Sequence, residues 1–217
     1  TDPIVEKGVL YSTSPTPTSN SQKIVSTEST NSFISIISGL QPSTSYYVRA
    51  YAKNSSSQFF YGEIIQVTTP CSSINIFPYT NSFESTSSLN CWSQEGDSFL
   101  SNIWQTKDST QIGGISSAEE GLKFAHIYSQ SANAQTRKLI TPPLNLSVLS
   151  QPYLKFYFAA KAKGDFQDIF KVYYKTSPTS SWQVLKTYSL INYPQWTKDS
   201  IMLPEKSNTY YIAFEGQ

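Results

Sequence analysis

The chain has 217 residues, a length that allows one large domain or two small ones. It carries 16 Lys and Arg against 15 Asp and Glu, and this net charge of +1 excludes the strongly basic surface by which proteins bind nucleic acid or an anionic membrane. No apolar run approaches the roughly 18 residues that a membrane helix needs, so we expect no membrane insertion within this chain.

Strand-forming runs separated by turn-forming stretches follow one another along the whole chain. The runs expected before Pro70 are 5–13, 33–38, 45–53 and 59–69. Those expected after it are 122–128, 137–141, 153–162, 168–176, 182–188, 198–203 and 209–215. A single helical turn within 116–122 is the one helical signal. The pattern predicts an all-β fold with two packed-sheet domains, residues 1–70 and residues 71–217.

Apolar and polar residues alternate most clearly over 153–158. Leu154, Phe156 and Phe158 share one face of this expected strand. The other face carries Tyr153, Lys155 and Tyr157. Such alternation is typical of a sheet with one buried face and one solvated face.

The scarcity of histidine and cysteine restricts the possible chemistry. One His and two Cys cannot supply the four ligands of a Cys/His zinc site. A Ser-His-Asp triad would have to use His126, and no G-x-S-x-G motif accompanies it. His126 lies in an expected strand, where a structural role is the commoner one. We therefore expect this chain not to be an enzyme.

Residues 39–52 resemble the E–F corner and the F strand of a fibronectin type III domain. The matching residues are Leu40, Pro42, Thr44, Tyr46, Val48 and Ala50. The resemblance implies a buried Tyr46 ring whose hydroxyl bonds to the corner backbone upstream. It also implies an N-terminally truncated sandwich whose A and B strands precede Thr1. Strand 33–38 would then expose an unpaired apolar edge.

From Cys71 onward an ordered series of segments resembles the MAM-like jelly rolls of bacterial secreted proteins. These choice-of-anchor domains are related to the cleaved adhesins of gingipain-type peptidases. The matching segments are 82–84, 91–92, 139–144, 154–158 and 211–216. The resemblance implies a jelly-roll β-sandwich that is C-terminally truncated, because the usual last strand would follow Gln217. It also implies a secreted or cell-surface protein of a bacterium.

The second resemblance implies two sites. Cys71 and Cys91 would form a disulfide in an oxidising compartment; the alternative is two free thiols in a reducing cytosol. Glu84 and Asp97, with Glu95 as a further candidate, would hold a structural Ca²⁺ through carboxylate oxygens. The alternative for these acidic residues is a solvated polar loop.

Aromatic side chains are the candidate ligand contacts. The chain has four tryptophans, Trp92, Trp104, Trp182 and Trp196. They could stack against sugar rings, but their match to core positions of the MAM-like family favours a role in packing. An outward sheet face carrying Tyr157 and Tyr173 is the more plausible ligand surface. A merely solvated sheet face is the alternative reading of the same pattern.

Two functions remain open on this sequence. The first is a non-catalytic adhesion or ligand-binding region of an exported bacterial surface protein, with a glycan or a host or extracellular protein as partner. The alternative is an accessory, non-catalytic region of a larger secreted hydrolase, a peptidase or a glycosidase. No motif supports a third class, an enzyme acting through this chain's own residues.

Overall fold

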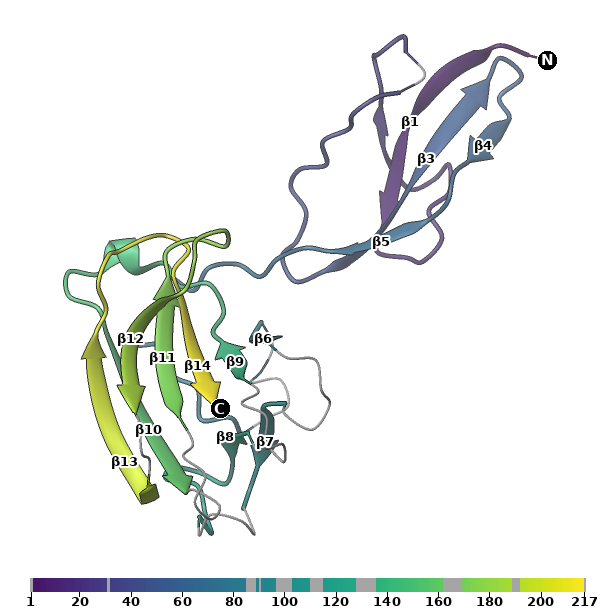
Figure 1. The fold of residues 1–217 in the computed structure, drawn as a ribbon. Coiled ribbons are helices and arrows are strands. Elements are labelled where there is room, and N and C mark those ends of the chain that lie inside the picture. The colour runs from purple at the N-terminus through teal and green to yellow at the C-terminus, as the bar shows by residue number, and fades with distance from the viewer. Residues whose placement is uncertain are drawn as a thin grey trace. The chain divides into compact units, whose positions relative to one another are not determined.

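The computed structural model divides the chain into two compact units, Thr1–Ser72 and Ser73–Gln217. It describes residues 2–30, 32–84, 89, 91–96, 103–109, 115–127, 136–161, 169–188 and 192–216. Within these residues the regular structure is β-strand apart from short 3₁₀ turns, so the expected all-β fold is confirmed. Figure 1 labels the strands of both units.

The first unit is built on one antiparallel sheet of five strands. They are β1 (Ile4–Ser12), β2 (Gln22–Val25), β3 (Ser45–Asn54), β4 (Phe59–Tyr61) and β5 (Ile65–Thr68). The order is β2-β1-β3-β4, and β5 also pairs with β3, which makes β3 the central strand. Leu10 on β1 and Tyr51 on β3 are the most buried large side chains of this sheet, at 0% and 3% exposed.

The prediction of a strand over 33–38 is wrong. These residues have no regular structure, so the unpaired edge strand that the resemblance implied does not exist. Ile34 and Ile36 are 84% and 80% exposed, while Phe33 and Ile37 are half-buried. A β-rich run alone does not make a strand, because a strand is held by hydrogen bonds to a neighbour along a ladder. Among the described residues of this unit, 33–38 have no such neighbour.

The corner before β3 has the contact expected of it. The Tyr46 side chain is 8% exposed, and its hydroxyl accepts a hydrogen bond from the backbone N–H of Gln41 at 3.1 Å. Burying the ring while its hydroxyl keeps a partner avoids the cost of an unsatisfied polar group. This confirms the expected role of Tyr46.

The second unit contains three antiparallel sheets. Its strands are β6 (Ser93–Gly96), β7 (Gln105–Lys107), β8 (Phe124–His126), β9 (Arg137–Ile140), β10 (Tyr153–Lys161), β11 (Phe170–Lys175), β12 (Gln183–Tyr188), β13 (Asn192–Met202) and β14 (Tyr211–Gly216). A five-stranded sheet has the order β12-β11-β14-β9-β6, and β10 pairs with β13. The third sheet joins β7 to β8. A 3₁₀ turn, η2 (Leu146–Val148), follows β9, and the expected helical turn within 116–122 is absent.

The core of the second unit lies between the five-stranded sheet and the β10–β13 pair. Its buried members are Leu144, Leu146, Phe158, Val172, Tyr174, Tyr188, Leu203, Tyr210 and Ile212. Rings from the two sheets meet there: Phe156 and Phe214 have centroids 5.5 Å apart, as have Phe158 and Phe170. The predicted alternation over 153–158 is confirmed, because its apolar face enters this core and its Tyr and Lys residues are exposed. The unit is therefore a β-sandwich with two outer faces.

Candidate functional site

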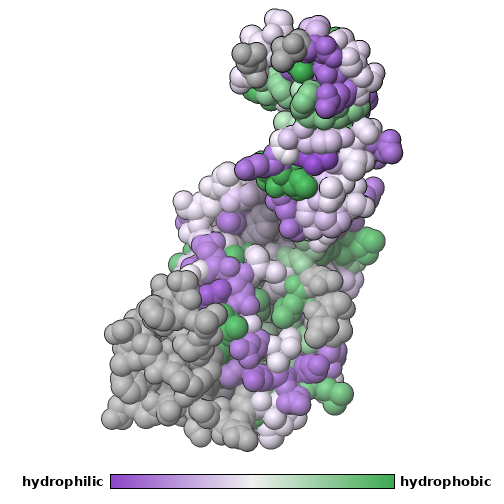
Figure 2. Space-filling view, turned by 90° about the vertical axis from the view of Figure 1, so that its right-hand side faces the viewer, coloured by the Kyte–Doolittle hydropathy of each residue, from purple (hydrophilic) through white to green (hydrophobic). Residues whose placement is uncertain are grey.

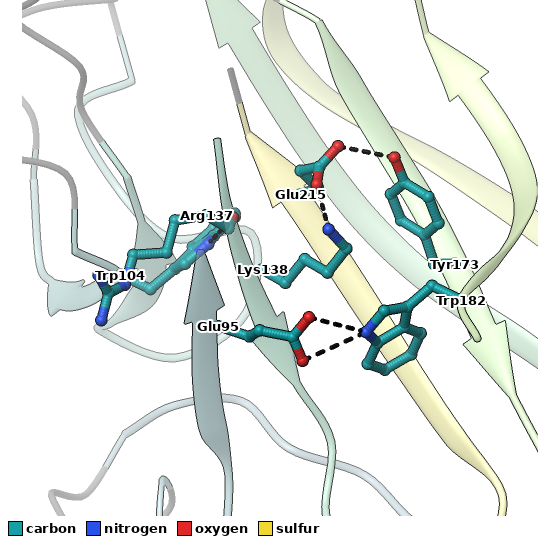
Figure 3. A network of polar contacts seen from close by, with 7 residues as sticks. All are labelled: Glu95, Trp104, Arg137, Lys138, Tyr173, Trp182 and Glu215. Atoms are coloured by element: carbon teal, nitrogen blue, oxygen red, sulfur yellow. Dashed lines mark hydrogen bonds and ion pairs between the residues drawn. The ribbon is translucent and has the colours of Figure 1, made fainter. Parts of the chain in front are cut away.

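The outer face of the five-stranded sheet gathers charged and aromatic side chains from four strands. The register places Lys138 of β9 between Glu215 of β14 and Glu95 of β6. Tyr173 and Lys175 of β11 share this face, because Val172 and Tyr174, which alternate with them along the strand, point into the core. Figure 3 shows Glu95, Lys138, Tyr173 and Glu215 converging from four strands of this sheet.

Glu215 is the centre of a buried polar network on this face. Its side chain accepts hydrogen bonds from the Tyr173 hydroxyl at 2.7 Å and from the Lys138 ammonium. The residue is only 4% exposed, so its charge depends on these two partners. Burial and the neighbouring Glu215 carboxylate raise the pKa of Tyr173, which keeps its hydroxyl a proton donor at neutral pH. The Lys138 ammonium also lies 4.8 Å from the centre of the Tyr173 ring.

Trp182 lies beside this network at the start of β12. Its indole Nε1 donates to both carboxylate oxygens of Glu95, at 3.2 and 3.3 Å (Figure 3). The Lys175 ammonium lies 4.6 Å from the indole and 5.3 Å from the centre of the Tyr211 ring. We call these four residues, Glu95, Lys175, Trp182 and Tyr211, the indole patch.

The indole patch combines three kinds of contact that a sugar can use. The rings of Trp182 and Tyr211 offer flat apolar surfaces. The exposed Glu95 carboxylate accepts hydrogen bonds, and the Lys175 ammonium donates them. Because Glu95 and Lys175 already hold the indole at its edge and over its ring, the aromatic surface is ordered before any ligand arrives.

The other three tryptophans serve the packing of the unit. The Trp92 indole donates to the Tyr79 hydroxyl at 3.0 Å, and the Trp104 indole donates to the Arg137 backbone oxygen at 2.9 Å. Trp196 donates to the backbone oxygen of Ser117 at 2.9 Å, and its ring meets Phe124 edge-on.

Sequence reasoning grouped Trp182 with these core-like tryptophans and missed its place on an outer face. No local signal marked it, because Val184 and Leu185 are adjacent apolar residues and only the strand pairing shows which of them faces outward. Trp182 is two residues from Val184, which pairs with the outward Tyr173.

Tyr157 and Tyr173 do not share a surface. Tyr157 lies on the outer face of the β10–β13 pair, whereas Tyr173 lies on the outer face of the five-stranded sheet. The inner faces of these two sheets enclose the core, so the two tyrosines point away from each other on opposite sides of the sandwich. The sequence could not separate them, because alternation identifies the outward side of each strand but not the sheet to which the strand belongs.

Both cysteines, Cys71 and Cys91, are disulfide-bonded. They are the chain's only cysteines, so the bond joins one to the other.

The candidate calcium ligands are engaged in other ways. Glu84 Oε1 accepts backbone N–H groups from Leu122 at 2.9 Å and Lys123 at 3.0 Å. Glu95 contacts Trp182, and Asp97 lies outside the described residues. Within the part of the chain that the structure describes, no three acidic, histidine or cysteine side chains gather as metal ligands would. These described residues alone do not fit a Ca²⁺ site, which needs six or more oxygens.

His126 is half-buried on β8, with its ring edge-on to Phe124. Burial and the nearby Lys107 charge lower its pKa below the ordinary value, because both disfavour the imidazolium. The side chain is therefore neutral at physiological pH.

Comparison with known proteins gives only distant similarities. No family model matches the chain, and no curated protein matches it. One solved structure, described as carbohydrate-binding modules of promiscuous specificity from the β-sandwich superfamily, has 12% identity and a TM-score of 0.46. The match covers 100% of this chain and 79% of that one. An alpha-L-rhamnosidase from Dictyoglumus thermophilum has 11% identity and a TM-score of 0.23, over 98% of this chain and 21% of the enzyme. At these scores neither similarity carries an argument about this chain.

The visible surface is mixed in character. Outside the grey residues, the face in Figure 2 is largely white to purple, and its green apolar residues stand in small separate groups. Among the residues that the structure describes, no helix has the length and apolar character needed to cross a bilayer.

Proposed function

We propose that the second unit is a non-catalytic carbohydrate-binding β-sandwich and that the indole patch is its sugar-binding surface. The observation that carries this proposal is the half-exposed Trp182 indole, held by Glu95 and Lys175 on an outer sheet face. A large aromatic side chain fixed between two charged groups is the kind of residue that dominates binding energy at an interface.

The wider setting that we propose is an exported bacterial surface protein that adheres through this unit. The disulfide supports export, because disulfides persist in oxidising compartments and are rare in the cytosol. The resemblances to fibronectin type III and MAM-like domains support the same setting. A glycan is the favoured partner, because the patch offers a flat ring with polar groups at its edge.

A glycan array on the intact chain, followed by calorimetric titration of the best neutral glycan, tests this proposal. Trp182→Ala should weaken binding about tenfold, the effect of removing about 1.4 kcal/mol of ring contact. Trp182→Phe should retain part of the affinity, because it keeps a ring but loses the hydrogen bond to Glu95. The matched control is Phe60→Ala, which removes a 48%-exposed ring from the first unit.

Thermal melts of each variant distinguish lost binding from lost folding. The proposal fails if the wild-type chain binds no glycan. It also fails if folded Trp182→Ala binds like the wild type, which would place the site elsewhere.

A further inference from the structure

The outer face of the β10–β13 pair is an exposed array of lysine and tyrosine. Cross-strand pairing sets Tyr153 opposite Met202 and Tyr157 opposite Lys198. Tyr153 is 56% exposed and Tyr157 is 43% exposed. We call this surface the lysine–tyrosine face; its residues are Tyr153, Lys155, Tyr157, Lys198, Ser200 and Met202.

Among the described residues, the two lysines of this face have no acidic partner. None of the ion pairs found among the described residues includes Lys155 or Lys198. The acidic residue nearest to Lys198 in sequence is Asp199, which points to the opposite side of β13. There its carboxylate accepts hydrogen bonds from the Lys186 ammonium at 2.6 Å and from the Tyr188 hydroxyl. Within the described part of the chain the face therefore carries two positive charges that no ion pair compensates, although the whole chain has a net charge of only +1.

Both ammonium groups lie near aromatic rings. Lys155 Nζ is 4.9 Å from the centre of the Tyr153 ring, and Lys198 Nζ is 5.4 Å from that of Tyr157. These cation–π contacts restrict two otherwise flexible side chains, which lowers the entropy lost when an anion binds. Lys155 and Lys198 are diagonal neighbours across the strand pair, so the two residues lie about 7–8 Å apart, with their Cβ atoms somewhat closer.

We propose that the lysine–tyrosine face binds an acidic polysaccharide. Two ammonium groups on one sheet face can pair with carboxylate or sulfate groups along an extended chain, and the tyrosine rings can cover the apolar faces of its sugars. An open sheet face suits an extended polymer better than a small ligand, which is bound by a concave pocket. Two lysines are too few for nucleic acid, whose binders carry a strongly basic surface. This surface is separate from the indole patch, on the other side of the sandwich, and does not rest on the function proposed for it.

Affinity measurements with polymers of known charge test this inference on the intact chain. The probes are polygalacturonate for carboxylates, heparin for sulfates and dextran as an uncharged reference. Lys155→Gln combined with Lys198→Gln should weaken binding of the preferred acidic polymer about thirtyfold, the scale of two lysines near an anionic surface. Tyr157→Ala should weaken it further without changing the net charge. Dextran should not bind this face, and raised salt should weaken the acidic polymers.

The matched control is Lys107→Gln combined with Lys206→Gln, which removes the same net charge from exposed positions outside the face. This control and Trp182→Ala should bind the acidic polymer like the wild type. An equal loss of affinity in the two double-lysine variants would overturn the proposal, because net charge alone would then explain binding. Binding of poly-L-glutamate or duplex DNA as tight as that of both polysaccharides would also overturn it. Failure to bind either acidic polysaccharide, with Trp182-dependent binding of a neutral glycan intact, would refute this inference alone.

Discussion

A single carboxylate oxygen of Glu84 holds the backbone where β8 is about to begin. It accepts two consecutive amide N–H groups, those of Leu122 and Lys123. Gly121 makes this approach possible. Its φ is +73°, and a Cβ there would lie 2.2 Å from the same Glu84 oxygen. The side chain that the sequence indicated as a metal ligand thus has a structural role, which no local pattern reveals because its partners are 38 and 39 residues away.

Glu84→Ala should lower the free energy of unfolding of the second unit by about 2 kcal/mol, because two backbone donors lose a charged acceptor. Glu84→Gln should lower this free energy of unfolding by less, because the amide oxygen still accepts hydrogen bonds. Chemical denaturation of the wild type and both variants measures whether their stabilities fall in this order. Equal stability of Glu84→Ala and the wild type would contradict it.

The calcium site stays a prediction that the same proteins can test. If Glu84 and Asp97 bind Ca²⁺, millimolar calcium should raise the melting temperature of the wild type, because a ligand that binds only the native state stabilises it. Asp97→Asn should remove that increase. If calcium does not change the melting temperature of the wild type, Glu84 acts through its backbone contacts alone.

At the scale of elements, the local patterns predicted the long strands but missed three short paired ones, β2, β6 and β7, and they predicted a strand over 33–38 that does not form. Strand β10 has the two faces that its sequence indicates. Residues 33–38 have a similar apolar content but no regular structure. The difference is pairing: β10 has a ladder with β13, whereas the described part of the first unit offers 33–38 no partner. Local composition cannot report whether a partner strand is present.

The corner that leads into β3 depends on one hydroxyl. Tyr46→Phe keeps the buried ring and removes only the acceptor of the Gln41 N–H. We expect a loss of about 1 kcal/mol in the stability of the first unit, typical of one hydrogen bond. A denaturation series that compares it with Tyr47→Phe, on the same strand, isolates the effect. An equal change in both variants would contradict a specific role for the corner.

At the scale of the whole molecule, the chain consists of two units with separate sheets and one disulfide. The loop closed by Cys71 and Cys91 includes Ile74, Phe77 and Tyr79, which pack against the core of the second unit. Reduction frees a loop of about twenty residues in the unfolded chain, a change worth about 3 kcal/mol by loop entropy.

Scanning calorimetry should therefore show two transitions, and only the one belonging to the second unit should move to lower temperature under reducing conditions. The double variant Cys71→Ser with Cys91→Ser should reproduce that shift without reductant. A shift of both transitions by the same amount would show that the bond stabilises the chain in some other way.

The sequence by itself determined the all-β class, the inward and outward sides of β10, the buried Tyr46 corner and the candidate cysteine pair. The first two follow from local alternation, whereas the Tyr46 corner and the cysteine pair are what the resemblances to the two families imply. Tertiary structure alone decided which strands share a sheet, and hence that Tyr157 and Tyr173 lie on opposite faces. It also decided that Trp182, rather than another tryptophan, meets Glu95 on a solvent-facing surface. The physical reason is that strand order and cross-strand register depend on contacts between residues far apart in sequence, which no short pattern encodes.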